Sequence, residues 1–248
     1  MTAIYVLWLR EMRRYMRSRV QVVASLGQPA LYLLALGFGL GPTFQKAGNG
    51  SYLQFVAPGV IGMTILFSAV FSGVGLLWDR QFGFLKETLV APVPRLHIML
   101  GKTLGGATVA LTQGLLMFAI STIVGFRPVS LVHVPIGIAI MALIAIVFAA
   151  LGTSIGSVLQ DMQGFQLVMN FLVMPIFFLS GALFPLGGLP KPMAVVTWID
   201  PLAYGVDGLR SVLIAASHFG LVADIAALLL FATGLLALGS RLFARIQI

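Results

Sequence analysis

The sequence predicts an all-helical membrane protein that crosses the bilayer several times. Of its 248 residues, 59% are apolar and 9% are charged, whereas about 25% of the residues in a soluble domain are charged. A helix needs about 20 apolar residues to cross the ~30 Å hydrocarbon layer, and six stretches of the chain reach that length. We therefore expect one domain over residues 1–248 with six transmembrane helices, at approximately 21–41, 53–78, 103–125, 134–158, 165–185 and 220–240.

The distribution of basic residues predicts the orientation of these spans. With six crossings, 11 of the 15 Lys and Arg residues lie on one side, together with both termini and the loop over 79–102. Cytoplasmic segments of membrane proteins are enriched in Lys and Arg, so we expect both termini in the cytoplasm. Because the basic residues are spread over short segments, the net charge of +8 indicates orientation and not nucleic-acid binding.

The first 19 residues have the pattern of an amphipathic helix. Arginines occupy one face, and the opposite face is apolar. This pattern predicts an interfacial helix that lies flat on the cytoplasmic surface, although a basic flank with chance periodicity remains the alternative. The apolar positions are Ile4, Leu7, Trp8, Met12, Tyr15 and Met16, and the arginines are Arg10, Arg13, Arg14 and Arg17.

Residues 193–216, within the segment 187–218, are apolar enough to suggest a seventh span, but charged side chains argue against one. Asp200, Asp207 and Arg210 lie in the middle of this stretch, and each charge at bilayer depth costs ~2.5–3.5 kcal/mol on insertion scales. We therefore expect an external re-entrant segment between the fifth and sixth spans, made of two short helices broken at Pro201.

Two short motifs suggest chemistry that the rest of the sequence does not support. Gly101-Lys102-Thr103 resembles the end of a phosphate-binding loop, but the first glycine of that motif would fall at Leu96. We therefore expect no nucleotide or other cofactor on this chain. Ser154 lies in a G-x-S-x-G pattern, and an intramembrane serine hydrolase is one alternative. The simpler interpretation is that Gly152 and Gly156 let another helix approach closely.

The interiors of the spans are almost free of ionisable groups. Only Asp224 occurs there, near the end of the sixth span, which disfavours an ion-coupled secondary carrier, the third class that we consider. Neutral polar residues among Met and Phe suit the pathway of an amphipathic passenger, although ordinary helix packing also accounts for them. The candidate lining residues are Thr64, Ser68, Gln166 and Asn170, and Gln113, Ser121, Thr122 and Ser180 have the same character.

The loop over 79–92 mixes both signs of charge with Phe82, Phe84 and two leucines. A short helix with apolar side chains between charges is typical of a docking surface for another protein. The loop therefore predicts a cytoplasmic partner, which could also supply the energy that the chain itself does not provide.

Three stretches of the chain resemble the type-2 permeases of ATP-binding-cassette (ABC) exporters. The subgroup is that of the daunorubicin-resistance and nodulation-factor export membrane subunits. The late stretch is the most specific, because Pro201, Leu202, Tyr204 and Arg210 fit the family pattern. The three stretches are YLQFVAPGVIGMTI, GFLKETLVAPVPRLHIMLGKTL and PLAYGVDGLR.

The resemblance implies roles for several residues. A coupling helix in the 79–92 loop would contact a separate cytoplasmic ATPase, and the loop around Asp161 would touch the same partner. The re-entrant motif of Pro201, Tyr204 and Arg210 would cap the exit, and spans two and five would lie near the route. The residues expected at the ATPase contact are Asp79, Arg80, Phe84, Leu85, Lys86, Glu87 and Asp161.

The same resemblance implies the function and the assembly. The chain would be the non-enzymatic membrane subunit of an ATP-driven multidrug or efflux exporter, moving an amphipathic drug-like or lipid-linked molecule; a polysaccharide or teichoic-acid exporter is the alternative. It would form a homodimer in a bacterial or archaeal inner membrane, with two ATPase subunits that bind ATP and Mg.

Overall fold

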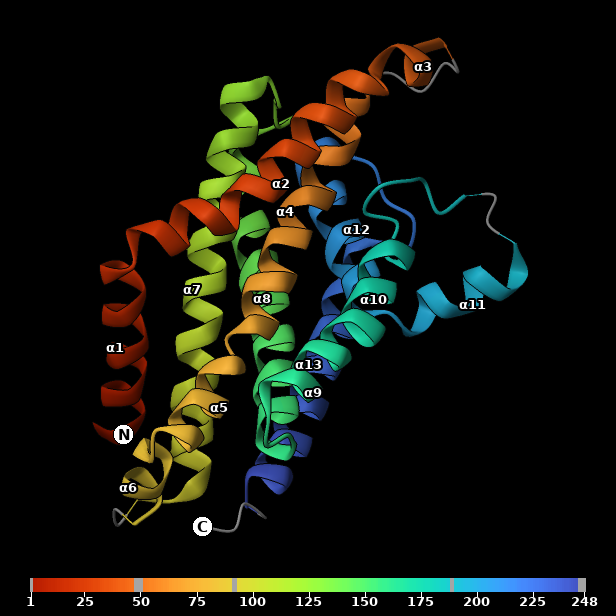
Figure 1. Ribbon diagram of the computed structural model, residues 1–248. Helices are drawn as coiled ribbons and strands as arrows, with labels where there is room; N and C mark the ends of the chain where they lie inside the picture. The colour runs from red at the N-terminus through yellow and green to blue at the C-terminus, as the bar shows by residue number, and fades with distance from the viewer. Residues whose placement is uncertain (1, 47–50, 91–92, 188–189, 245–248) are drawn as a thin grey trace.

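The computed structural model describes residues 2–46, 51–90, 93–187 and 190–244, and these residues form helices and connecting loops (Figure 1). The elements, in chain order, are α1 (Thr2–Arg17), α2 (Arg19–Gly39), α3 (Gly41–Lys46), α4 (Tyr52–Phe71), α5 (Val74–Gln81), α6 (Phe84–Val90), α7 (Arg95–Val124), η1 (Leu131–His133), α8 (Val134–Val158), α9 (Met162–Val168), η2 (Met169–Val173), α10 (Met174–Leu179), α11 (Lys191–Ile199), α12 (Pro201–Ile214) and α13 (Leu221–Ala244).

Six helical runs among the described residues are long and apolar enough to cross a membrane, so the predicted fold class is confirmed. They are α2, α4 with α5, α7, α8, α9 through α10, and α13. Of these six runs, the second, α4 with α5, is the most buried, and α4 packs against α2, α7, α8 and α12. In Figure 1, α6, the start of α1 and the end of α13 lie at one end of the bundle, and α3 lies at the other.

Glycines allow α4 and α5 to approach α8 closely, as the sequence predicted for Gly152 and Gly156. A methyl group on Gly152 would overlap the Val70 carbonyl, and one on Gly156 would lie 2.6 Å from the Gly73 carbonyl oxygen. The second span is interrupted at this contact, because α4 ends at Phe71 and α5 begins at Val74. Close backbone contact of this kind is typical of small residues four apart in membrane helices.

Helix α1 packs lengthwise along the first half of α7, which the sequence did not predict (Figure 1). Two glycines of α7 leave room for it: a Cβ atom at Gly101 would lie 2.9 Å from that of Leu7, and one at Gly105 would lie 2.8 Å from that of Glu11. The Trp8 indole also donates a hydrogen bond of 2.9 Å to Thr108. Part of the apolar face of α1 therefore contacts protein, whereas Met16 is exposed. Its position at the membrane surface stays a prediction.

The boundaries of two spans differ from the predicted ones. Helix α7 begins at Arg95, directly after Pro94, and not near residue 103; Lys102 lies within the helix and is paired with Glu11 and Asp79. The fifth span contains the π-helical turn η2 and ends at Leu179 and not near residue 185, since Gly181 adopts a φ of 74° and turns the chain away.

The segment after the fifth span forms two short helices, α11 and α12, as predicted. The break falls at Asp200 and Pro201, where the Asp200 carboxylate accepts a 2.8 Å hydrogen bond from the Leu202 amide and caps α12. Helix α12 is largely buried and packs against α4, α8 and α13. It is therefore part of the core of the bundle.

We predict that the contact between α4 and α8 tolerates no added methyl group. Gly152→Ala should destabilise the protein by about 1–3 kcal/mol, because the new Cβ overlaps backbone that cannot move freely. The matched control is Gly234→Ala on α13, where nothing lies within 4 Å of the added atom; it should be neutral or stabilising by up to ~1 kcal/mol. Thermal unfolding of the purified variants measures both effects, and equal melting temperatures would contradict the prediction.

Candidate transport cavity and charge cluster

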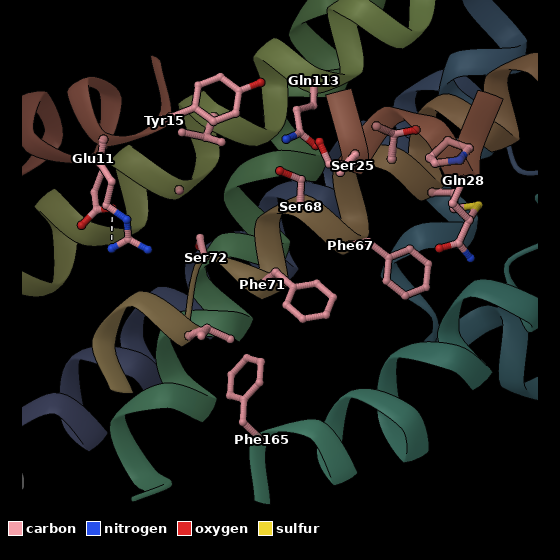
Figure 2. Close-up of a pocket in the computed structure, with 18 of the residues that line it drawn as sticks. Glu11, Tyr15, Ser25, Gln28, Phe67, Ser68, Phe71, Ser72, Gln113 and Phe165 are labelled. Atoms are coloured by element: carbon pink, nitrogen blue, oxygen red, sulfur yellow. Dashed lines mark ion pairs between the residues drawn. The ribbon is translucent and has the colours of Figure 1, made fainter. Parts of the chain in front are cut away.

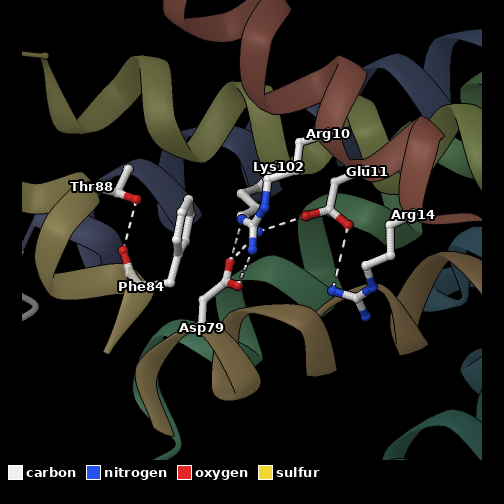
Figure 3. A network of polar contacts seen from close by, with 7 residues as sticks. All are labelled: Arg10, Glu11, Arg14, Asp79, Phe84, Thr88 and Lys102. Atoms are coloured by element: carbon white, nitrogen blue, oxygen red, sulfur yellow. Dashed lines mark hydrogen bonds and ion pairs between the residues drawn. The ribbon is translucent and has the colours of Figure 1, made fainter. Parts of the chain in front are cut away.

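Four charged side chains meet where α1, α5 and α7 come together, and we call Arg10, Glu11, Asp79 and Lys102 the charge cluster (Figure 3). The Asp79 carboxylate is 4% exposed and accepts hydrogen bonds from both Arg10 Nη atoms, at 2.7 and 3.2 Å. It also accepts one from Lys102 Nζ, which in turn donates to Glu11 Oε1 at 2.6 Å. The cluster therefore joins three helices through one buried carboxylate.

The pairing explains why charges can be buried here. An unpaired buried charge is costly, and removing one partner of a buried pair leaves such a charge behind. Burial lowers the pKa of Arg10, but the hydrogen bond and charge of Asp79 outweigh that effect, so the pKa is raised overall. The Arg10 guanidinium also lies 3.7 Å from the centre of the Phe84 ring on α6. The cluster thus extends to the helix that follows α5.

Of the residues predicted to contact an ATPase, some are engaged in contacts inside the fold and others are exposed. Asp79 is buried in the charge cluster, and Arg80 donates to the Leu159 carbonyl at 2.6 Å and to the Ser157 carbonyl at 3.1 Å, at the end of α8. Glu87 and Asp161 are exposed, and Asp161 caps α9 by accepting a 2.6 Å hydrogen bond from the Gly164 amide. Phe84 is partly buried beneath Arg10. The side chains of Leu85 and Lys86 lie outside the described residues.

A cavity of about 530 Å³ lies between α1, α2, α4, α5, α7 and α9 (Figure 2). Its wall includes Thr64, Ser68 and Gln166, three of the four predicted lining residues. Asn170 is exposed in η2 and is not part of the wall. The wall combines aromatic and apolar side chains, among them Met63, Phe67, Phe71 and Phe165, with neutral polar ones, among them Ser25, Gln28, Ser72 and Gln113.

The cavity adjoins the charge cluster at one end. Glu11 belongs to both, and Arg14, 3.9 Å from Glu11, also lies in the wall. The Arg14 guanidinium lies 4.9 Å from the Trp78 ring centre. Sequence reasoning missed the part that α1 has in this wall, because hydropathy and charge do not reveal which helix α1 contacts. The glycines at 101 and 105, four apart, were the available signal.

The three motif residues of the external segment hold α12 in place. Pro201 is the first residue of α12, and the Tyr204 hydroxyl donates a 2.8 Å hydrogen bond to the Trp198 carbonyl on α11. Arg210 is 5% exposed, donates to the Ala182 carbonyl at 3.0 Å and to the Phe55 carbonyl at 3.3 Å, and lies 3.8 Å from the Phe55 ring centre. These contacts fix α12 against α4. Their role at an exit stays a prediction.

One carboxylate of this segment is buried with half of its hydrogen-bonding capacity unused. Asp200 Oδ1 caps α12, and Oδ2 has no hydrogen-bond partner within the described part of the chain. Burial raises the pKa of Asp200 to about 7, and the hydrogen bonds from the amides of Leu202 and Ala203 oppose the rise.

Ser154 has a packing role in this structure. Its hydroxyl donates a 2.7 Å hydrogen bond to the Ala150 carbonyl one turn earlier in α8. A Cβ atom on Gly239 would lie 2.6 Å from the Ser154 oxygen, so the hydroxyl faces α13 at close range. This environment fits the interpretation of the GTSIG stretch as a helix-packing motif.

A bundle of six membrane-spanning helices, with a cavity of mixed polar and apolar walls between α1 and four of the spans, defines a polytopic membrane protein with space for a small ligand. The chain belongs to the ABC-2 type transporter family, which it matches over residues 2–214. The resemblance to type-2 ABC permeases is thereby confirmed.

Two relatives illustrate the family. Inner membrane transport permease YadH of Escherichia coli strain K12 is 29% identical over 232 residues, covering 92% of this chain and 90% of that protein. Nodulation protein J of Sinorhizobium fredii is 27% identical over 232 residues, covering 91% and 88% of the two chains. The protein is therefore a multi-pass membrane subunit of the ABC-2 permease type.

We predict that α1 depends on the charge cluster for its position. Asp79→Asn should lower the stability by on the order of 3 kcal/mol, because it leaves the buried Lys102 and the partly buried Arg10 short of a counter-charge. The matched control is Asp161→Asn at an exposed helix cap; asparagine also caps well, so the change should stay within about 0.5 kcal/mol. Thermal unfolding and limited proteolysis near residue 17 measure the effect. Equal melting and equal cleavage in the two variants would contradict it.

Proposed function

We propose that the chain is the membrane subunit of an ATP-driven exporter that moves an amphipathic, drug-like or lipid-linked molecule out of the cytoplasm or the inner leaflet. The observation that carries this proposal is the cavity of about 530 Å³, whose wall includes Glu11 of the charge cluster. The aromatic side chains of the wall suit the apolar part of an amphipathic molecule, and the hydroxyl and amide groups of the wall suit its polar part. Family membership supports the same function.

The energy would come from two cytoplasmic ATPase subunits, which would bind ATP and Mg. Helix α6 and the residues before it are the surface that would dock the ATPase: Glu87 is exposed, Phe82 is 83% exposed and Val90 is 77% exposed. Exposed apolar side chains beside charges are typical of binding surfaces. Arg10 links α6 to the charge cluster, so a movement of α6 would reach the cavity wall.

A second copy of the chain would complete the route, and anionic or neutral lipids would surround the pair. The fifth span supports this assembly, because Leu167, Phe171 and Phe178 are exposed on it next to the cavity wall formed by α9. We infer a bacterial or archaeal inner membrane with both termini in the cytoplasm, on the basis of the basic residues. A lipid-linked polysaccharide or teichoic acid is the alternative class of passenger. A permease for such a molecule would need the same ATPase subunits and the same second copy.

We predict that the purified chain neither binds nor hydrolyses ATP by itself, and that it associates with a cassette ATPase co-expressed from a neighbouring gene. Glu87→Lys should lower ATP-driven transport about tenfold or more, since like-charge contacts at an interface cost several kcal/mol. Insertion into the membrane should be unchanged.

The matched control is Lys46→Glu, which reverses an exposed charge on α3 at the opposite end of the bundle. It should transport like the wild type. Transport at the wild-type rate by Glu87→Lys would contradict the docking surface, and absence of association with any cassette ATPase would contradict the proposed function. Ser154→Ala should leave transport unchanged, whereas loss of a hydrolytic activity would favour the enzyme alternative.

A further inference from the structure

The wall of the cavity contains a buried hydroxyl group without a hydrogen-bond partner. Tyr15 of α1 is 7% exposed, and its hydroxyl has no partner within the described ranges of the chain. The side chain lies in the cavity wall. Folded proteins leave few buried polar atoms unpaired, so each such atom needs an explanation.

Gln113 of α7 lies next to this hydroxyl and faces the same space (Figure 2). Burial raises the pKa of Tyr15, and the Gln113 side chain is close enough to offset part of that rise. The two groups nevertheless do not meet in hydrogen-bond geometry in this structure. Gln113 itself is 3% exposed. Both groups therefore have hydrogen-bonding capacity that a ligand in the cavity can use.

The chemistry of the two groups limits what they can bind. A phenol and a primary amide each donate and accept hydrogen bonds, and neither carries a charge at neutral pH. Two charged wall residues lie on the same helix, and both have contacts within the protein: Glu11 accepts from Lys102 at 2.6 Å, and Arg14 lies 3.9 Å from Glu11 and 4.9 Å from the Trp78 ring centre. The pair thus suits an uncharged hydroxyl or carbonyl group and not an ammonium or a phosphate.

The surrounding wall suits the remainder of such a molecule. Phe67 and Phe71 of α4 and Phe165 of α9 also line the cavity, and the hydroxyl of Ser68 lies between these rings and Gln113 in Figure 2. Aromatic faces bind flat apolar groups. Tyr15 follows Glu11 by four residues, which puts both on one face of α1. A group bound at Tyr15 therefore contacts the helix that carries two members of the charge cluster.

We propose that Tyr15 and Gln113 form the polar subsite of the cavity and bind an uncharged hydroxyl or carbonyl group of the passenger. This inference rests on the proposed function of the cavity, which it makes more specific. It also makes α1, the helix before the first span, part of the ligand site. Tyr15 and Gln113 are then specificity-determining residues.

The test measures binding of daunorubicinone, the uncharged fluorescent aglycone of daunorubicin, to the full-length chain in lipid nanodiscs. The aglycone carries hydroxyl and carbonyl groups on an apolar ring system. Tyr15→Phe and Gln113→Leu should each weaken its affinity about three- to tenfold, the loss expected for one hydrogen bond between neutral groups. The double variant should lose less than the product of the two factors, because both side chains bind the same group.

The matched control is Tyr5→Phe, which removes the same hydroxyl from a side chain of α1 that is 57% exposed and outside the cavity wall. Its affinity should equal that of the wild type. Melting temperatures without ligand should be unchanged in Tyr15→Phe, because the hydroxyl has no partner to lose.

Three results would overturn the inference. Equal affinities of the wild type, Tyr15→Phe and Gln113→Leu would show that the two side chains do not bind the ligand, and the proposed function of the cavity would still stand. A lower melting temperature of Tyr15→Phe with unchanged affinity would show a structural role. No saturable binding by the wild type would contradict the proposed use of the cavity itself, and the subsite would fall with it.

Discussion

The buried carboxylate of Asp79 holds together the end of the bundle that carries α6. It accepts hydrogen bonds from Arg10 of α1 and from Lys102 of α7, so the position of α1 depends on it. A carboxylate in such a site is stable only while its cations stay in contact, because low polarity strengthens the attraction and raises the cost of an unpaired charge. Since α1 also forms part of the cavity wall, the shape of the cavity depends on the same interaction.

This arrangement connects two features that lie far apart in the sequence. The Arg10 side chain touches both Asp79 and the Phe84 ring of α6. Glu11, the next residue, contacts Lys102 and faces the cavity. In the proposed function, a displacement of α6 by a docked ATPase would therefore move α1, and α1 would change the wall against which the passenger lies. A cluster with two discrete arrangements is the physical requirement for such coupling.

The sequence predicted those features that depend on length and charge. Six apolar stretches were enough to predict the six spans. The charges at Asp200 and Arg210 were enough to predict the two short helices between the last two spans. The packing of α1 on α7 could not be predicted in this way, because it depends on Gly101 and Gly105, far along the chain from α1. Hydropathy ranks glycine as neutral and says nothing of its neighbours.

The candidate site, like the fold, could be predicted from the sequence only in part. Thr64, Ser68 and Gln166 stood out as polar residues in apolar spans, and they line the cavity. The resemblance to type-2 ABC permeases implied that Asp79 contacts the ATPase, but Asp79 is 4% exposed. Its burial depends on two cations from other helices, Arg10 and Lys102, and only the three-dimensional arrangement brings these together. The lysine of the GKT stretch thus has an electrostatic function within the bundle.

The most direct test of this account measures whether α1 and α6 move as one unit. The chain contains no cysteine, so pairs of spin labels can be placed without removing native residues. One pair joins Arg13 of α1 to Thr88 of α6, and a second joins Arg13 to Gln163 of α9, across the cavity. With the ATPase bound, addition of a non-hydrolysable ATP analogue should change the distance from Arg13 to Gln163 and leave the distance from Arg13 to Thr88 unchanged. A change in the distance from Arg13 to Thr88, with the cavity distance constant, would contradict the account.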